Sequence, residues 1–208
     1  MCRKFYNLIK YTPILWSIFE FYEPLIIKEE DLQYIFQHCR SFRVFNIGYS
    51  IYTGRLPALD FNCVLNLRRA NSLTWLNLTN SSISTTCFLQ FMPNLEILDL
   101  SQCLNLKDCD FLAVSLCTNL DSLYISFNEI SPKTIVDIVT YTPKIQVLDL
   151  SGIYLNYIHV LDILDKCYKS LMSFYLSFDN TVQENDFDRF MHFNYIDLSY
   201  RIYKPSKS

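Results

Sequence analysis

Glycine and proline are scarce in this chain: 3 of its 208 residues are Gly and 7 are Pro. Collagen-like and low-complexity sequences are rich in these residues, so both classes are excluded. Long hydrophobic runs are also missing. The best candidate, residues 11–19, contains nine uncharged residues, about half of the roughly 18–20 that a membrane helix needs. Lys10 interrupts the apolar region and no small-residue cleavage site follows, so a signal peptide is not indicated. We therefore expect an intracellular protein, cytoplasmic and/or nuclear, without a membrane partner.

Strong charge of either sign is lacking too. The formal net charge is −3, and basic clusters are as short as Arg68–Arg69. Nucleic acid is therefore not expected as the main partner. The chain has no Gly-rich phosphate loop, no G-x-S-x-G and no C-x-x-C, and its three histidines are far apart in sequence. We expect no catalytic residue, no metal and no cofactor, so the protein is predicted not to be an enzyme.

What the chain does contain is a repeated apolar pattern. Residues 94–103, NLEILDLSQC, place Leu95, Leu98 and Leu100 at the spacing LxxLxL, which fits neither one amphipathic helix nor a simple strand. The pattern returns six more times, and every step but the first falls within the 20–29 residues typical of leucine-rich repeats. The first apolar positions of the seven copies are Phe42, Leu73, Leu95, Leu120, Ile145, Leu171 and Phe193.

This period predicts an α/β leucine-rich-repeat solenoid of about seven repeats. A curved parallel β-sheet would form the concave side and helices the convex side, with the last two apolar residues of each LxxLxL pointing inward. We expect residues 1–24 to form a helical segment or cap, 25–203 the solenoid, and 204–208 a tail. The expected inward column contains Leu76, Leu98, Ile125 and Leu148.

Several segments between the copies carry helical signals. Residues 29–39 have apolar side chains at i, i+3, i+4 and i+7, which make one helical stripe. Ser131 and Pro132 form an N-cap and N1 pair ahead of an apolar run. Residues 156–167 repeat the apolar spacing. These segments are predicted to return the chain from one strand to the next.

The eight cysteines follow the repeat rather than a disulfide or metal pattern. Cys117 lies three residues before the next repeat begins, where other copies have Met92 and Thr142. A position shared with Met favours a packed thiol. Cys103 falls where another copy has Asn128, at a bend where a side chain can satisfy buried backbone groups. We therefore predict packed thiols, although disulfides and metal binding remain alternatives.

The copies CTNLDSLYISFN (117–128) and MPNLEILDLSQC (92–103) resemble the cysteine-containing leucine-rich repeat, C-P-x-L-x-x-L-x-L-x-x-C, which is characteristic of F-box proteins. The N-terminal MCRKFYNLIKYTPILW resembles the last third of an F-box. This resemblance implies a substrate-recognition subunit of a Skp1–cullin–F-box ubiquitin ligase. It assigns Skp1 contact to the apolar residues of that segment, Phe5, Leu8, Leu15 and Trp16.

Three other interpretations stay open at this point. The N-terminal apolar residues would equally cover the first repeat, since an open solenoid needs a cap. The repeats alone would suit an intracellular scaffold unconnected to ubiquitin. A secreted protein is the third, because Asn77 and Asn80 each begin a formal glycosylation sequon.

The concave face is the predicted binding site for a protein target. Between the two inward apolar residues of each copy lies an outward residue, and acids and tyrosines alternate along this row. Exposed aromatic residues beside polar groups are typical of protein-binding surfaces. The acids suggest a partner segment with Lys or Arg, although Asp and Ser would also recur if they merely suited the strand and turn. The predicted contact residues are Trp75, Asn77, Asp99, Tyr124, Asp149, Tyr175, Tyr195 and Asp197.

Overall fold

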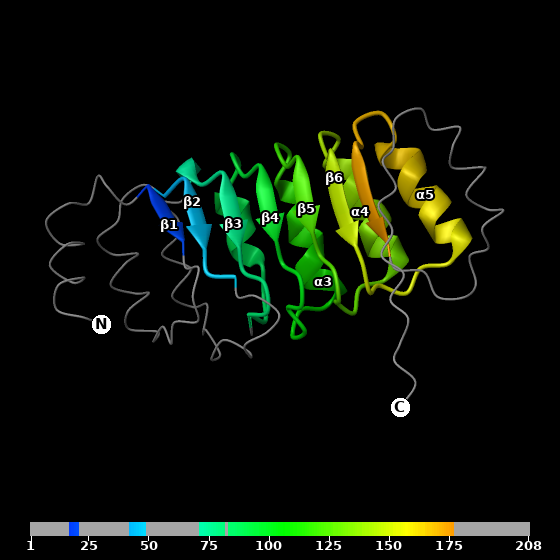
Figure 1. Cartoon of the computed structure of the whole chain (residues 1–208), viewed down its shortest axis with the longest axis horizontal. Coiled ribbons are helices and arrows are strands. Elements are labelled where there is room, and N and C mark those ends of the chain that lie inside the picture. The colour runs from blue at the N-terminus through cyan, green and yellow to red at the C-terminus, as the bar shows by residue number, and fades with distance from the viewer. Residues whose placement is uncertain (1–16, 21–41, 49–70, 82, 177–208) are drawn as a thin grey trace, which may run out of the picture.

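The computed structural model of the chain describes residues 17–20, 42–48, 71–81 and 83–176. Within these ranges seven short strands form one parallel sheet in chain order, and Figure 1 shows them side by side in a single row. The predicted α/β class, with a parallel sheet and helices, is confirmed. The strands are β1 (Ile18–Glu20), β2 (Val44–Asn46), β3 (Trp75–Asn77), β4 (Ile97–Asp99), β5 (Ser122–Tyr124), β6 (Val147–Leu150) and β7 (Ser173–Leu176).

The strands pair without slippage, which puts equivalent residues of each repeat side by side. Leu76 pairs with Leu98, Leu98 with Leu123, and Leu123 with Leu148. All four are fully buried. The expected column was therefore wrong at one residue, because Leu123 and not Ile125 lies in register with Leu98. Side chains alternate between the two faces of a strand. Ile125 lies two residues after Leu123, so it also points inward, but at the next inward position.

Strand β1 was not among the seven predicted copies. It pairs with β2, with Ile18 opposite Val44. The sequence around it nevertheless has the repeat spacing, since Trp16, Phe19 and Phe21 stand at LxxLxL positions. The helical segment predicted for residues 1–24 thus does not include these three strand residues, and residues 1–16 lie outside the described ranges.

Helical segments connect successive strands and lie together on one side of the sheet (Figure 1). The connections after β3 and β4 each contain a 3-10 helix, the one after β4 also a four-residue α-helix, and those after β5 and β6 each contain one longer α-helix. These segments are η3 (Cys87–Phe91), α3 (Asp108–Phe111), η4 (Leu112–Leu116), α4 (Pro132–Tyr141) and α5 (Tyr157–Cys167).

The two long helices begin where the sequence predicts. The Ser131 hydroxyl accepts a hydrogen bond from the Thr134 N–H at the start of α4, with Pro132 at the first helical position. The Asn156 side chain accepts from the His159 N–H at the start of α5. Both helices pack their apolar side into the core, where Ile135 and Leu164 are fully buried. The helix predicted for residues 29–39 lies outside the described ranges.

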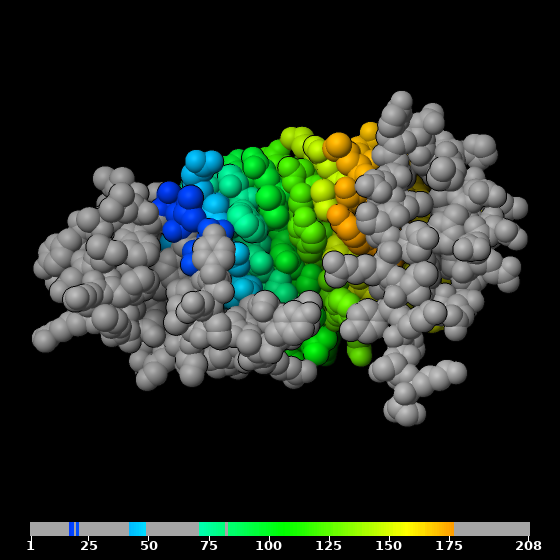
Figure 2. Space-filling view, viewed as in Figure 1, coloured from blue at the N-terminus to red at the C-terminus, as the bar shows by residue number. Residues whose placement is uncertain are grey.

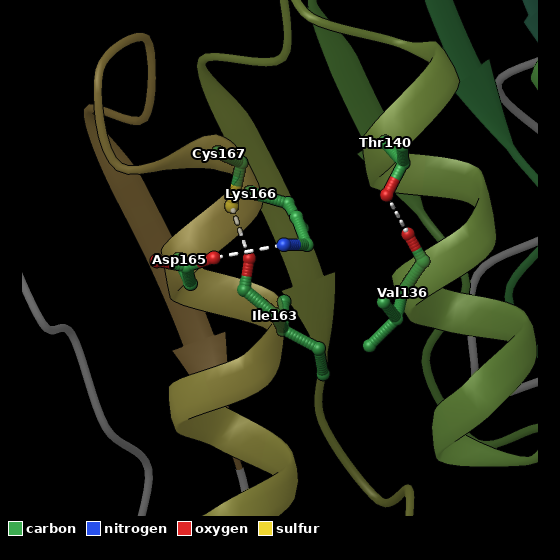
Figure 3. Close-up of polar contacts among 6 residues, drawn as sticks. All are labelled: Val136, Thr140, Ile163, Asp165, Lys166 and Cys167. Carbon is green, nitrogen blue, oxygen red and sulfur yellow. Dashed lines mark hydrogen bonds and ion pairs between the residues drawn. The ribbon is translucent and has the colours of Figure 1, made fainter.

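Polar side chains of α4 and α5 form hydrogen bonds with the backbone of their own helix. In Figure 3 the Thr140 hydroxyl donates to the Val136 carbonyl at 2.7 Å, and the Cys167 thiol donates to the Ile163 carbonyl at 3.2 Å. Lys166 and Asp165 form an ion pair at the exposed surface of α5. Cys167 is buried, so its hydrogen bond allows a thiol to occupy an apolar position.

The turn after each strand uses one conformation in four successive repeats. The residue seven places after the first apolar position has a positive φ in each, and these residues are Asn80, Gln102, Phe127 and Gly152. The N–H of each of the first three donates to a carbonyl of the next repeat, at 2.8–2.9 Å. This left-handed residue turns the following side chain into the core. The sheet is thereby extended by a second ladder of backbone hydrogen bonds.

The side chains turned inward serve buried carbonyls, as predicted for Cys103 and Asn128. The Cys103 thiol donates to the Leu78 carbonyl at 3.2 Å, and the Asn128 amide donates to the Leu100 carbonyl at 2.9 Å. Each bond reaches back to the preceding repeat. Cys103, Cys117 and Cys167 are all buried and free, which is consistent with packed thiols among the described cysteines.

Candidate functional site

The strand face is the side of the sheet that the described helices leave uncovered. In β2 to β7 it is formed by the first and third residues of each strand, which are half-buried, whereas the second residue is buried. In Figure 2 the side chains of β2 to β7 follow one another across the middle of the view in chain order. Equivalent residues of successive strands therefore form a row of side chains across the face, one row for each outward position of the repeat.

The Asp and Asn side chains of this face form hydrogen bonds that stabilise the turns after the strands. The Oδ1 atom of Asp99 accepts a hydrogen bond from the Ser101 N–H at 2.9 Å, and Asp149 accepts from the Ser151 N–H at the same distance. Asn77 does the same for the Thr79 N–H. Each side chain thus holds the turn that follows its strand. The recurrence of Asp and Asn is explained by this bond, but the negative charge is not, because Asn forms it equally well.

Tyr124 lies between two carboxylates. The register puts Asp99 and Asp149 on the strands at either side of it, with Tyr175 on the strand beyond Asp149. Neighbouring strands are about 4.8 Å apart, so the two carboxylates are separated by roughly 10 Å. Burial raises the pKa of the Tyr124 hydroxyl, and the nearby Tyr175, Asp99, Asp149 and Asp121 raise it further. The centre of the face is thus negative and aromatic.

The Asp99 carboxyl is itself unfavourably placed as an anion. Burial raises its pKa above the ordinary value, and the charge of Asp149 adds to the effect. Hydrogen bonds from Ser101 and Thr79 work in the opposite direction without cancelling it. No Lys, Arg or His occurs in any of the seven described strands. The strand residues therefore offer no cation of their own to neutralise this carboxylate.

A groove of about 780 Å³ adjoins the strand face where the chain enters β4 to β7. Glu96 and Asp121 lie in it immediately before their strands, and Met172, which is 60% exposed, lies before β7. Lys144 is also in the groove, but its ammonium donates to the Asn119 side-chain oxygen at 2.7 Å. The groove is open and lined mainly by polar side chains. Its two acids continue the negative surface of the strand face.

The structure brings together six of the predicted contact residues on one face. Four lie on adjacent strands as direct neighbours, and Trp75 and Asn77 lie on β3 beside them. Trp75, which was expected to be exposed, is half-buried, and it lies in register with Val44 on one side and Ile97 on the other. Tyr195 and Asp197, and the proposed Skp1-contact residues Phe5, Leu8, Leu15 and Trp16, lie outside the described ranges.

The groove residues are not among the predicted contact residues. Glu96, Asp121 and Met172 all follow the first apolar position of their repeat, so a signal existed in the repeat alignment. These residues precede the strand in sequence, and only the three-dimensional arrangement joins them to its face. Within the described ranges no three His, Cys, Asp or Glu side chains form a group that could hold a metal ion. The helices in those same ranges are too short and polar to cross a membrane.

No model of a known family matches the chain, and no curated protein matches it in sequence. Solved structures do. The crystal structure of internalin C2 from Listeria monocytogenes has a TM-score of 0.56 with this chain at 13% identity. The match covers 97% of this chain and 85% of the internalin chain. Internalins are leucine-rich-repeat proteins, so the comparison shows a leucine-rich-repeat fold.

Proposed function

We propose that this leucine-rich-repeat chain is a non-catalytic scaffold of the cytoplasm or nucleus that holds a protein partner on its strand face. The observation that supports this most directly is the row of half-buried aromatic and acidic side chains on a sheet side without described helices. Folding alone gives no reason for Trp75, Tyr124 and Tyr175 to stand there, because small residues fit the same positions elsewhere. Large aromatic side chains contribute much of the binding energy at protein interfaces.

We further propose that the repeats form one continuous solenoid. The seven predicted copies would stack throughout the chain, and residues 16–21 would add another in register with β2. Such a surface grows by one strand per repeat and so can hold a long segment of a partner. Tyr195 and Asp197 would then extend the same two rows of side chains beyond Tyr175.

The test of the scaffold uses matched variants of the whole chain. Partners captured from cells by the wild type are compared with those captured by Trp75→Ala with Tyr175→Ala, and by Tyr141→Ala. Tyr141 is the control because it is 62% exposed on α4, away from the strand face. We expect the strand-face variant to lose a set of partners that Tyr141→Ala keeps. Equal capture by all three proteins, or loss with Tyr141→Ala alone, would refute the proposal.

A second candidate function is the substrate adaptor of a Skp1–cullin–F-box ubiquitin ligase. It rests on the resemblance of MCRKFYNLIKYTPILW to the end of an F-box. Trp16 separates the two candidates, because it is also the first apolar position of the repeat that contains β1. An adaptor would lose Skp1 co-purification on Trp16→Ala and keep its thermal stability. In a scaffold, where Trp16 is a repeat residue, Trp16→Ala would lower the thermal stability. The wild-type scaffold would not bind Skp1 at all.

A further inference from the structure

We propose that the strand face recognises a cationic side chain, Arg or Lys, of an extended partner segment, held over the Tyr124 ring between the Asp99 and Asp149 carboxylates. This inference rests on the proposed scaffold function and names the chemistry of its partner. It depends on three features of the face. The first is that an aromatic ring lies next to two acids. The second is that the described strands contain no Lys, Arg or His, and the third is the groove beside these residues.

The first feature is geometric. Tyr124 is in register with Asp99 on one side and Asp149 on the other. A cation over the ring would lie about 5 Å from each neighbouring strand. Cations are attracted to an aromatic face within about 6 Å of its centroid. At that distance both carboxylates attract the cation electrostatically, and its N–H groups can donate to one of them at a time.

The second feature is the excess of negative charge. Asp99, Asp121 and Asp149 all act on the Tyr124 hydroxyl electrostatically, and Tyr175 lies near enough to do so as well. The nearest lysine in the groove, Lys144, is bonded to Asn119 and not to one of these acids. Turn formation does not require the charge, since Asn77 holds its turn as an amide. Two of the seven described residues in this row are Asp, and a basic partner supplies a reason for their charge.

The third feature is the path for the rest of the partner. The groove spans the entrances of β4 to β7 and includes Asp121, three residues before Tyr124 in the sequence. Four strands cover about 14 Å, which an extended chain spans with about four residues. Glu96 and Asp121 lie at one end and the exposed Met172 near the other. A segment with a basic residue and a neighbouring apolar residue fits this order.

The test uses peptides that differ at one position. Capped nine-residue Gly/Ser peptides carry Arg, Lys, Gln or Glu at the centre, and each is titrated into the ¹⁵N-labelled whole chain. We expect the Arg and Lys peptides to shift amide signals of β4, β5 and β6, and the Gln and Glu peptides to leave them unchanged. Equal effects of Arg and Gln, or no shifts in these strands with any peptide, would overturn the inference.

Variants then assign the effect to the named groups. Asp99→Asn with Asp149→Asn removes both charges and keeps the turn bonds, as Asn46 and Asn77 do naturally. It should weaken binding of the Arg peptide at least tenfold, whereas Asp162→Asn on α5 should not change it. Tyr124→Phe keeps the aromatic ring and should retain binding, and Tyr124→Leu should lose it. Unchanged binding in the double Asn variant would contradict the inference even if partner capture still depended on Trp75 and Tyr175.

Discussion

The ring of Phe127 occupies the space in which a side chain at Gly152 would begin. A Cβ atom at Gly152 would lie 2.4 Å from Cδ1 of Phe127, closer than real carbon contacts allow. Both residues have positive φ and stand at the same position of consecutive repeats. The chain has only 3 Gly, and this one is placed where an aromatic residue of the preceding repeat needs the room.

Gly152→Ala should therefore destabilise the fold for two reasons. The added methyl overlaps the Phe127 ring, which is 44% exposed and must rotate away and give up its packing. Its Cβ also opposes the positive φ of 74°, which costs about 1–2 kcal/mol in the left-handed region. Urea unfolding of the variant and the wild type measures the sum. In the background Phe127→Ala, the same change should cost less, because only the φ penalty remains. Identical costs in both backgrounds would show that the two side chains do not compete for space.

Leu148→Ala should destabilise the protein by roughly 2–5 kcal/mol, as is usual for a buried leucine in a packed core. Leu148 is fully buried and in register with Leu123 and Phe174, so little can collapse into the cavity. Chemical denaturation measures the change. Met172→Ala is the control, because this side chain is 60% exposed, and it should shift the midpoint little.

Asn128→Ala should cost about 1–3 kcal/mol, because it leaves buried carbonyl groups without a donor. The Asn128 amide donates to the carbonyls of Leu100, Ile125 and Ser126 at 2.8–3.3 Å. Asn128→Asp should be worse than alanine, since a carboxylate oxygen would face these same carbonyl oxygens. Thermal unfolding compares the two variants. An aspartate variant as stable as the wild type would contradict the role of the amide as a donor.

The described cysteines should differ in reactivity with iodoacetamide. Cys87 and Cys109 are exposed, whereas burial raises the pKa of Cys103 to about 11 and of Cys117 and Cys167 to about 12. Because the thiolate is the reactive form, the buried thiols should remain unmodified in the folded protein at pH 8. Peptide mass spectrometry after brief labelling reads each site separately. Labelling of Cys117 at the rate of Cys87 without denaturant would refute the packed-thiol interpretation.

Asp99 should make stability fall as pH rises through the acid range. Burial raises its folded-state pKa above the unfolded value near 3.8, so the folded state binds a proton more tightly than the unfolded state. Its favourable contribution is thus present below the unfolded pKa and is lost as pH rises through the folded pKa. Asp99→Asn has no such titration, while it keeps the Ser101 turn bond. Melting temperatures of the two proteins from pH 3 to pH 7 should therefore converge at low pH and separate in favour of the variant at higher pH. The opposite divergence would show that the carboxylate is stabilised as an anion.

Much of the fold could be predicted from the sequence because a repeat encodes its own geometry. The spacing of Leu95, Leu98 and Leu100 predicts a strand with inward side chains, and the period gives the order of the strands. The starts of α4 and α5 could also be predicted from the sequence, because an N-cap depends on residues within one turn of each other. The same repetition made the roles of Cys103 and Asn128 predictable from one aligned position.

Features that depend on contact between repeats were decided only by the tertiary structure. The register placed Leu123 in the column assigned to Ile125, and it added β1 to the sheet ahead of the seven predicted copies. The groove beside Asp121 joins residues from four repeats, whose equivalent positions are 25 or 26 residues apart in sequence. The sequence determined which side chains lie inside and which outside, because that follows from local spacing. Which outside residues become neighbours depends on how the repeats stack, and stacking is a property of the whole chain.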